Sequence, residues 1–252
     1  MTDADRRSSA PALDKGLDIV ELLADAGRPL SVREIAERMG RSKNEIFRMV
    51  NVLIERGYLA RMGPDGLGLT NKLFDIGLKT PRTRDLVTVA TPLIDELARR
   101  TRQSVHLVLP NRGETVVIAS TSGNPDMSFT LRLGYRRPLI DALSGMVLIA
   151  FQPAEQRDAL IADALPLVKE PRSQSAILRE ARAIARKGFA ERDSPDLVGV
   201  RDLAAPILQP NGAAVATLVV SCMKRRERTT DFTAVLADLL SVSAELSTRL
   251  YG

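Results

Sequence analysis

The chain has 252 residues, more than one compact domain usually contains, so we expect two domains that each bury their own core. Its single cysteine excludes a disulfide framework and a set of thiolate ligands for a structural metal, as is typical of a reducing cytoplasm. No apolar run approaches the roughly 20 residues that a membrane-spanning helix needs, and no signal core is present, so we expect a cytoplasmic protein. The net charge of +5 permits nucleic-acid binding without establishing it.

The amino-terminal stretch predicts a tail followed by a helix. Residues 1–10 are small and charged, and we expect them to be disordered. Residues 11–26 predict the first helix, which Gly27 ends. Its apolar face is expected to pack against two later helices and contains Leu13, Leu17, Val20 and Leu23, with Ile19 and Leu22 beside them.

Two short helix signatures follow. Ser31 stands three residues before Glu34, and Ser42 stands three residues before Glu45. This spacing predicts a capping box at the start of each helix, in which hydroxyl and carboxylate each accept a bond from a free backbone N–H. Gly40 lies between the two helices and allows a left-handed turn, so the stretch indicates a helix-turn-helix.

The second of these helices has two different faces. Its inward face is predicted to contain Ile46, Met49, Val50, Leu53 and Ile54, and its outward face Lys43, Asn44, Phe47, Arg48 and Asn51. Asn and Arg can bind base edges in pairs of hydrogen bonds, Lys can neutralise phosphate, and Phe can cover a thymine methyl or a sugar. The alternative is an ordinary solvated helix face.

A small hairpin is predicted directly after this helix. Residues 58–62 and 67–70 are strand-like, and the turn between them reads Gly63-Pro64-Asp65-Gly66. From Arg28 to Arg61, eight Lys or Arg residues face four Asp or Glu residues, so this stretch carries four of the five net positive charges. The concentrated charge favours a DNA-binding unit in which Ser42 fixes the helix end and Arg61 holds phosphate from the hairpin.

These residues resemble the DNA-binding domain of the IclR family of bacterial transcriptional regulators. The resemblance also includes residues 12–23 of the first helix and the segment Arg28-Pro29-Leu30-Ser31 before the second. It implies a winged helix-turn-helix domain over residues 11–78, a linker helix over residues 79–101 and an effector-binding domain over residues 102–252.

The linker region predicts a short helix over residues 71–78 and a longer one over residues 83–100. The apolar stripe of the longer helix is wide enough to pack on its own domain and on a partner chain. A purely intramolecular helix would show the same stripe, so dimerisation is an inference that the family resemblance strengthens.

The carboxy-terminal half predicts intermixed strands and helices. The expected strands are residues 103–109, 115–120, 128–133, 204–209 and 213–223, and the expected helices are residues 144–151, 153–165, 173–187 and 230–250. This order indicates an α+β fold, an antiparallel sheet covered by helices. The half resembles the GAF-like effector domain of the same family through residues 103–107, 138–139, 188–190 and 204–207. Met146 stands where lysine is common, so the cavity is expected to differ.

The resemblance implies a ligand site between the sheet and the loop before the last hairpin. The matching positions are Leu143, Ser144, Arg192, Asp202, Val219 and Ser221, with Phe129 and Leu131 as walls. A guanidinium offers two parallel donors to a carboxylate, so Arg192 and the two serines can hold an acidic ligand. An equally open alternative makes Arg192 and Asp202 a solvent-exposed pair on a loop.

No catalytic constellation is found in the sequence. His106 is the one histidine and lies in an apolar strand, which favours a core or pocket residue over a general base. Cys222 has no partner for a metal site or an activated nucleophile. We therefore expect no enzyme activity, no metal and no cofactor, and we interpret the basic run at residues 224–228 as a solvated loop.

Together these features predict an effector-responsive DNA-binding regulator, more often a repressor in families of this build. We expect a homodimer or tetramer on a palindromic operator, with the ligand changing the separation of two recognition helices that must match their half-sites. One alternative is an activator of the same build. Another is a metabolite-binding protein without DNA binding, which would show no salt-dependent binding to promoter DNA.

Overall fold

The computed structural model describes residues 10–78, 81–124, 130–170, 172–224 and 230–252. Most of the expected tail, Phe129 and most of the basic run at 224–228 lie outside the described residues. The chain divides into two compact units, Met1–Arg84 and Asp85–Gly252. Each unit has its own hydrophobic core and is described by itself.

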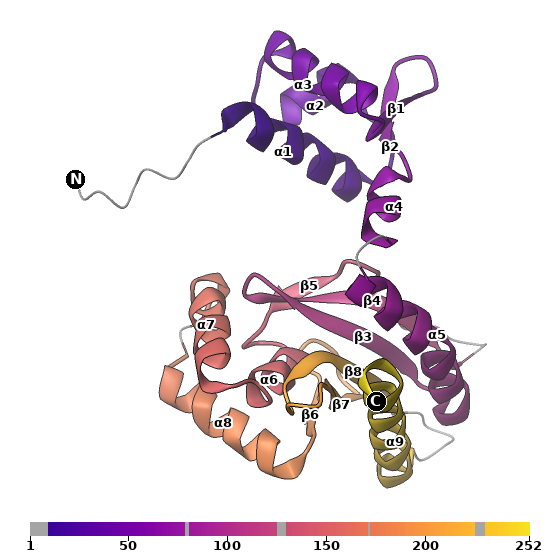
Figure 1. The fold of residues 1–252 in the computed structure, drawn as a ribbon, viewed down its shortest axis with the longest axis vertical. Coiled ribbons are helices and arrows are strands. Elements are labelled where there is room, and N and C mark those ends of the chain that lie inside the picture. Colours follow the sequence, from indigo (N-terminus) through magenta and orange to yellow (C-terminus); the bar gives the residue numbers. More distant parts are fainter. Residues whose placement is uncertain (1–9, 79–80, 125–129, 171, 225–229) are drawn as a thin grey trace. The chain divides into compact units, whose positions relative to one another are not determined.

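The first unit contains four helices and a two-stranded hairpin in its described part, in the order that the sequence predicts (Figure 1). The elements are α1 (Pro11–Ala26), α2 (Val32–Arg38), α3 (Lys43–Glu55), β1 (Leu59–Met62), β2 (Gly66–Leu69) and α4 (Lys72–Leu78). The three helices α1, α2 and α3 share a core built around Ile19, Ile35 and Ile46, all fully buried. The predicted winged helix-turn-helix is confirmed.

The helix starts of α2 and α3 differ in one detail from the prediction. At α2 the capping box is complete, because Ser31 accepts from Glu34 N and the Glu34 carboxylate accepts from Ser31 N. At α3 Ser42 accepts from Glu45 N at 3.3 Å, whereas the Glu45 carboxylate pairs with Lys15 of α1. The second box is therefore half formed, and its carboxylate joins α3 to α1.

The expected apolar face of α1 is wrong at two positions. Leu13 and Leu17 are 62% and 53% exposed, whereas Ile19 and Leu23 are buried in the core. Leu13 and Leu17 lie one turn apart on the same side of the helix, and this side does not face α2 and α3. The amino-terminal half of α1 thus leaves apolar surface uncovered within its own unit.

The second unit is an antiparallel six-stranded sheet with helices on both faces, so the predicted α+β architecture is confirmed. The strands lie in the order β5-β4-β3-β8-β7-β6. Their bounds are β3 (Ser104–Asn111), β4 (Glu114–Ser122), β5 (Arg136–Pro138), β6 (Ala190–Asp193), β7 (Val200–Leu208) and β8 (Ala214–Met223).

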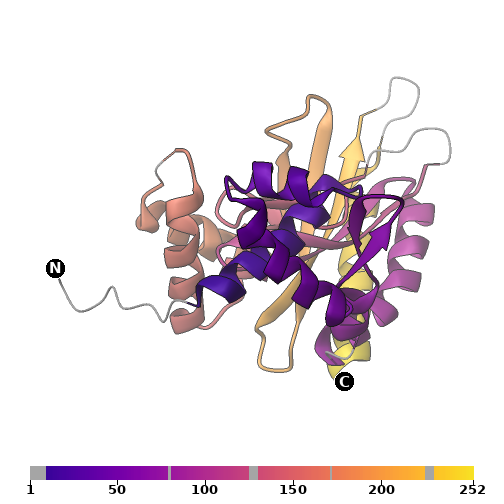
Figure 2. The same ribbon diagram turned by 90° about the horizontal axis from the view of Figure 1, so that it is seen from above.

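The helices divide between the two faces of this sheet. Figures 1 and 2 both show α5 (Pro81–Thr101) and α9 (Phe232–Tyr251) together on one side and α7 (Ala154–Ala164) and α8 (Gln174–Lys187) on the other. A core beneath α5 and α9 contains Leu97 and Leu239, and a separate core contains the largely buried α6 (Leu143–Ala150). The apolar stripe of α5 therefore packs on the sheet of its own unit.

Two strand predictions in this unit are wrong. Residues 130–133 of the expected strand 128–133 are not extended in a sheet, and the strand beside β4 is β5 instead. The sequence also gave no sign of β6, and β7 begins at Val200 rather than at 204. The segments 190–193 and 200–203 are rich in charge. They form strands because they pair with each other and, for 200–203, also with β8, and no alternation of apolar and polar residues reveals this pairing.

Candidate functional sites

The outward face of α3 is a polar surface with one large apolar side chain. Lys43, Asn44, Arg48 and Asn51 are exposed, and so is the capping residue Ser42. Phe47 is 53% exposed among them. An exposed aromatic ring on a charged helix face can gain from covering a base methyl group or a sugar.

The cations of this face are free to bind an external anion. Within the described residues, Lys43, Arg48 and Arg61 of β1 form no ion pair, whereas Arg33 of α2 pairs with Glu37. The structure thus exposes every residue that the sequence analysis assigned to DNA contact, on the start and one face of α3 and on the first strand of the hairpin.

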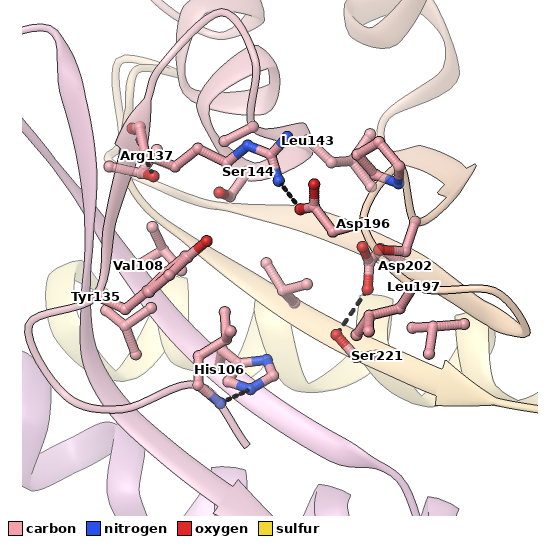
Figure 3. Close-up of a pocket in the computed structure, with 18 of the residues that line it drawn as sticks. His106, Val108, Tyr135, Arg137, Leu143, Ser144, Asp196, Leu197, Asp202 and Ser221 are labelled. Atoms are coloured by element: carbon pink, nitrogen blue, oxygen red, sulfur yellow. Dashed lines mark hydrogen bonds and ion pairs between the residues drawn. The ribbon is translucent and has the colours of Figure 1, made fainter. Parts of the chain in front are cut away.

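A cavity of about 270 Å³ lies in the second unit, between the sheet, the start of α6 and the loop that joins β6 to β7 (Figure 3). Seven of the eight residues expected at the effector site line it: Leu131, Leu143, Ser144, Arg192, Asp202, Val219 and Ser221. Phe129, the eighth, lies outside the described residues. Residues distant in the sequence are therefore brought to one cavity.

Arg192 and Asp202 face the same cavity from neighbouring strands. They are register partners on β6 and β7, and both are partly buried, so the alternative of a solvent-exposed pair on a loop is wrong. Ser221 of β8 donates a hydrogen bond of 2.6 Å to Asp202 Oδ1. Burial raises the pKa of Asp202, and burial lowers the pKa of Arg192.

The environment of Arg192 leaves part of its guanidinium unused. Its Nη2 donates to the backbone oxygen of Asp141. Its Nε is buried and has no hydrogen-bond partner among the described residues. A buried N–H without a partner costs free energy, so a ligand oxygen that reaches this group is favoured.

His106 of β3 forms part of the opposite wall of the cavity from Arg137 and Ser144 (Figure 3). The ring is 1% exposed, and its Nε2 accepts a 3.1 Å hydrogen bond from Leu131 N. Burial lowers the pKa of His106 to about 4, so the ring is neutral near pH 7 and carries its proton on Nδ1. This excludes a cationic histidine as the anion-binding group.

The start of α6 opens on the same cavity. The helix begins after Ala142, which has no side-chain cap, and Ala142, Leu143 and Ser144 all line the cavity. Gly145 follows, and a Cβ atom there would come within 2.1 Å of Leu139 O, so glycine lets this end pack closely on the preceding loop. The uncapped N–H groups and the helix dipole favour an anion at this end.

Further cavity residues escaped the sequence analysis. Arg137 of β5 forms an ion pair with Asp196, which lies in the β6–β7 loop, and Tyr135 lies on the wall nearby (Figure 3). Arg137 directly precedes the Pro138-Leu139 segment that carried the family resemblance. Its partner lies 59 residues away, and no local pattern indicates such a contact.

The described residues offer no group of three or more His, Cys, Asp or Glu side chains that could hold a metal ion. Cys222 is buried, and burial raises its pKa to about 12, which keeps the thiol protonated. None of the helices in the described part is long and apolar enough to cross a membrane.

Comparison with known proteins gives the same assignment for both units. Residues 12–63 match the IclR helix-turn-helix domain, and residues 79–248 match the bacterial transcriptional regulator IclR C-terminal domain. The HTH-type transcriptional regulator KdgR of Escherichia coli is 25% identical over 94% of this chain and 93% of its own. XynR of the same organism, also an HTH-type transcriptional regulator, is 26% identical over 85% of this chain and 87% of its own.

Solved structures share the fold. An IclR homolog from Microbacterium hydrocarbonoxydans, complexed with 4-hydroxybenzoate, has a TM-score of 0.78 at 20% identity over 95% of this chain and 98% of its own. An IclR regulator from Alicyclobacillus acidocaldarius has a TM-score of 0.75 at 18% identity over 96% of this chain and 99% of its own. The chain therefore belongs to the IclR family: it is a DNA-binding transcriptional regulator, not an enzyme, with an effector-binding carboxy-terminal domain.

Proposed function

We propose that this regulator acts in the cytoplasm as a repressor, which binds a palindromic operator with α3 and the hairpin and releases it when a small carboxylic acid occupies the cavity. We choose a carboxylic acid as the ligand because Arg192 and the uncapped start of α6 line the same cavity. An activator of the same build would use the same contacts at a different operator position.

The DNA contacts follow from the exposed face of α3. Asn44 and Arg48 have the donors to bind base edges, and Asn51 lies on the same helix face two turns further on. Lys43 and Arg61 are suited to phosphates, Ser42 holds the helix end, and Phe47 covers a sugar or a thymine methyl.

The ligand contacts follow from the polar groups of the cavity. A carboxylate can bind the guanidinium of Arg192 together with the free N–H groups at the start of α6, with help from the Ser144 hydroxyl. Asp202 keeps an acceptor oxygen besides the one that binds Ser221, so it favours a hydroxyl group elsewhere on the acid. Leu131, Val219 and other apolar walls cover the carbon skeleton. The IclR homolog from Microbacterium hydrocarbonoxydans is complexed with an acid of this kind, 4-hydroxybenzoate.

A palindromic operator requires two copies of α3, and we propose that the regulator is a homodimer or a pair of dimers. The first unit exposes apolar side chains on α1 and α4, among them Leu17 and Phe74, which a second copy can cover. Leu17→Glu is expected to shift the protein to a smaller species in sedimentation velocity. An unchanged sedimentation coefficient would remove α1 from the interface.

The DNA contacts are tested with Arg48→Ala in full-length protein, by fluorescence anisotropy with a promoter duplex at fixed salt. Loss of one base or phosphate contact of about 1–3 kcal/mol weakens binding roughly 5- to 150-fold. The matched control is Arg182→Ala, which removes the same charge from an exposed position on α8. Equal affinity of the two variants would exclude Arg48 from the interface.

The ligand site is tested by a thermal-shift screen of hydroxylated and aromatic carboxylic acids that includes 4-hydroxybenzoate. We expect Arg192→Ala to abolish the shift given by an acid that stabilises the wild type, and Arg192→Lys to restore part of it because one cation remains. Operator binding without acid should be unchanged in both variants. An equal shift in wild type and Arg192→Ala would place the carboxylate elsewhere.

A further inference from the structure

We propose that residues 194–199, the loop between β6 and β7, form a lid over the cavity, and that the Arg137–Asp196 ion pair is the latch that holds it closed. The proposal rests on the proposed function in one respect only: the effector is taken to enter and leave the cavity when the lid opens.

Backbone hydrogen bonds fix the two ends of the loop, and the ion pair with Arg137 holds Asp196 in its middle. Ser194 N donates to Val200 O at 2.8 Å, and Lys224 N donates to Gly199 O at 2.7 Å. These bonds close the base of the loop on itself and on the residue after β8. Gly199 adopts φ +83°, a conformation that other residues rarely take, and it lets the chain turn sharply back into β7. The loop can therefore swing about a defined base.

The loop forms one side of the cavity. Pro195, Asp196 and Leu197 all line it, so moving the loop opens the cavity to solvent. Leu197 faces the cavity and is still 40% exposed, and an apolar part of a bound acid would cover it. Ligand binding therefore favours the closed position of the lid.

The latch joins opposite ends of the sheet. Arg137 belongs to β5, one edge strand, and Asp196 follows β6, the other edge strand. Both residues line the cavity, so their ion pair connects two of its walls (Figure 3). The two side chains are 27% and 59% exposed. An ion pair this exposed contributes at most about 1 kcal/mol, so the latch opens readily and weakens with salt. A weak latch suits a gate that small acids must pass in both directions.

The test measures access to the cavity without requiring the effector. Val219→Cys places a thiol on the cavity wall, because Val219 lines the cavity and is almost fully buried. The probe is methyl methanethiolsulfonate, a small neutral thiol reagent, so changes of charge in the lid do not alter its approach. The native thiol of Cys222 stays silent because it is buried and protonated.

In this background, Asp196→Asn is expected to raise the rate of thiol modification by about two- to fivefold, the factor that corresponds to losing an exposed ion pair. Asp163→Asn, an equal change of charge at an exposed site on α7, should leave the rate unchanged. Asp196→Arg should raise the rate at least as much, and adding Arg137→Asp to it should restore slow modification by reforming the pair in reverse.

Equal rates in the Val219→Cys protein and its Asp196→Asn variant would overturn the latch, and so would a reversed pair that fails to slow the reaction. Neither result depends on operator DNA or on the acid screen. Loss of the proposed ligand site at Arg192 would likewise leave the measured gating intact, so the two proposals fail separately.

Discussion

Among single residues, His106 shows how burial fixes the chemistry of the cavity. The ring is neutral because burial lowers its pKa from 6.5 to about 4. In the unfolded chain the same ring takes up a proton below about pH 6.5. Protons therefore bind the unfolded state preferentially, and the free energy of unfolding falls as the pH drops from 6.5 toward 4.

His106→Gln removes this titration and keeps an acceptor for Leu131 N. Between pH 7 and pH 5, the wild type should lose about 2 kcal/mol more free energy of unfolding than the variant. Urea unfolding at the two pH values measures the difference. Equal losses in the two proteins would mean that His106 has the same pKa in the folded and the unfolded state.

Asp202 has the opposite relation to pH. Burial raises the pKa of Asp202, so the folded state binds the proton more tightly than the unfolded state does. The free energy of unfolding therefore falls as the pH rises through the raised pKa and the carboxylate ionises. Asp202→Asn keeps an acceptor for Ser221. We expect this variant to melt at or above the wild-type temperature at pH 7, with the gain shrinking toward pH 4. A lower melting temperature at pH 7 would show that the ionised carboxylate stabilises the fold.

The residues around the cavity show what local sequence can and cannot reveal. Ser144, Arg192 and Ser221 were found through family resemblance, but no local pattern decided whether Arg192 and Asp202 lie in a loop or in strands. The short strand β6 carries three charged residues among four, and it becomes a strand through pairing with β7. Arg137 and Asp196 are likewise joined by tertiary contact across the whole sheet.

At the scale of elements, α3 was predictable because its signals are local. Its bounds, its cap at Ser42 and its two faces all follow from spacing within thirteen residues. The same reasoning failed for α1, because Leu13 and Leu17 have the spacing of a core face and yet have no neighbour within the unit to cover them. Amphipathic spacing identifies an apolar face but not the partner that buries it.

The cap of α3 separates stability from DNA contact. Ser42→Ala removes the acceptor for Glu45 N and should cost about 1 kcal/mol in the free energy of unfolding. Ser42→Asp keeps the cap and should keep the stability, but it puts a negative charge beside the DNA phosphates and should weaken operator binding. Chemical denaturation and anisotropy measure the two effects. Normal operator affinity in the Asp variant would show that this end of α3 lies away from the phosphates.

For the whole molecule, the question is how a ligand in the second unit changes DNA binding by the first. The two units, Met1–Arg84 and Asp85–Gly252, are each compact, and each has its own hydrophobic core. A ligand can shift operator binding only if the DNA-competent and incompetent states differ in affinity for it, and the operator must then change ligand affinity by the same factor. Coupling of this kind does not require the two cores to unfold together.

Two matched substitutions test that independence in the full chain. Ile46 in the first unit and Ile149 in the second are both fully buried, and Ile→Val at either should cost about 1 kcal/mol. Ile46→Val is expected to lower a melting transition of the first unit by about 4–8 °C, and Ile149→Val to lower one of the larger second unit by about 2–4 °C. Each should leave the other transition in place in a calorimetric scan. A single transition shifted by both substitutions would mean that the two units unfold together. A ligand that stabilises the second unit could then also stabilise the first, without any change in the arrangement of the recognition helices.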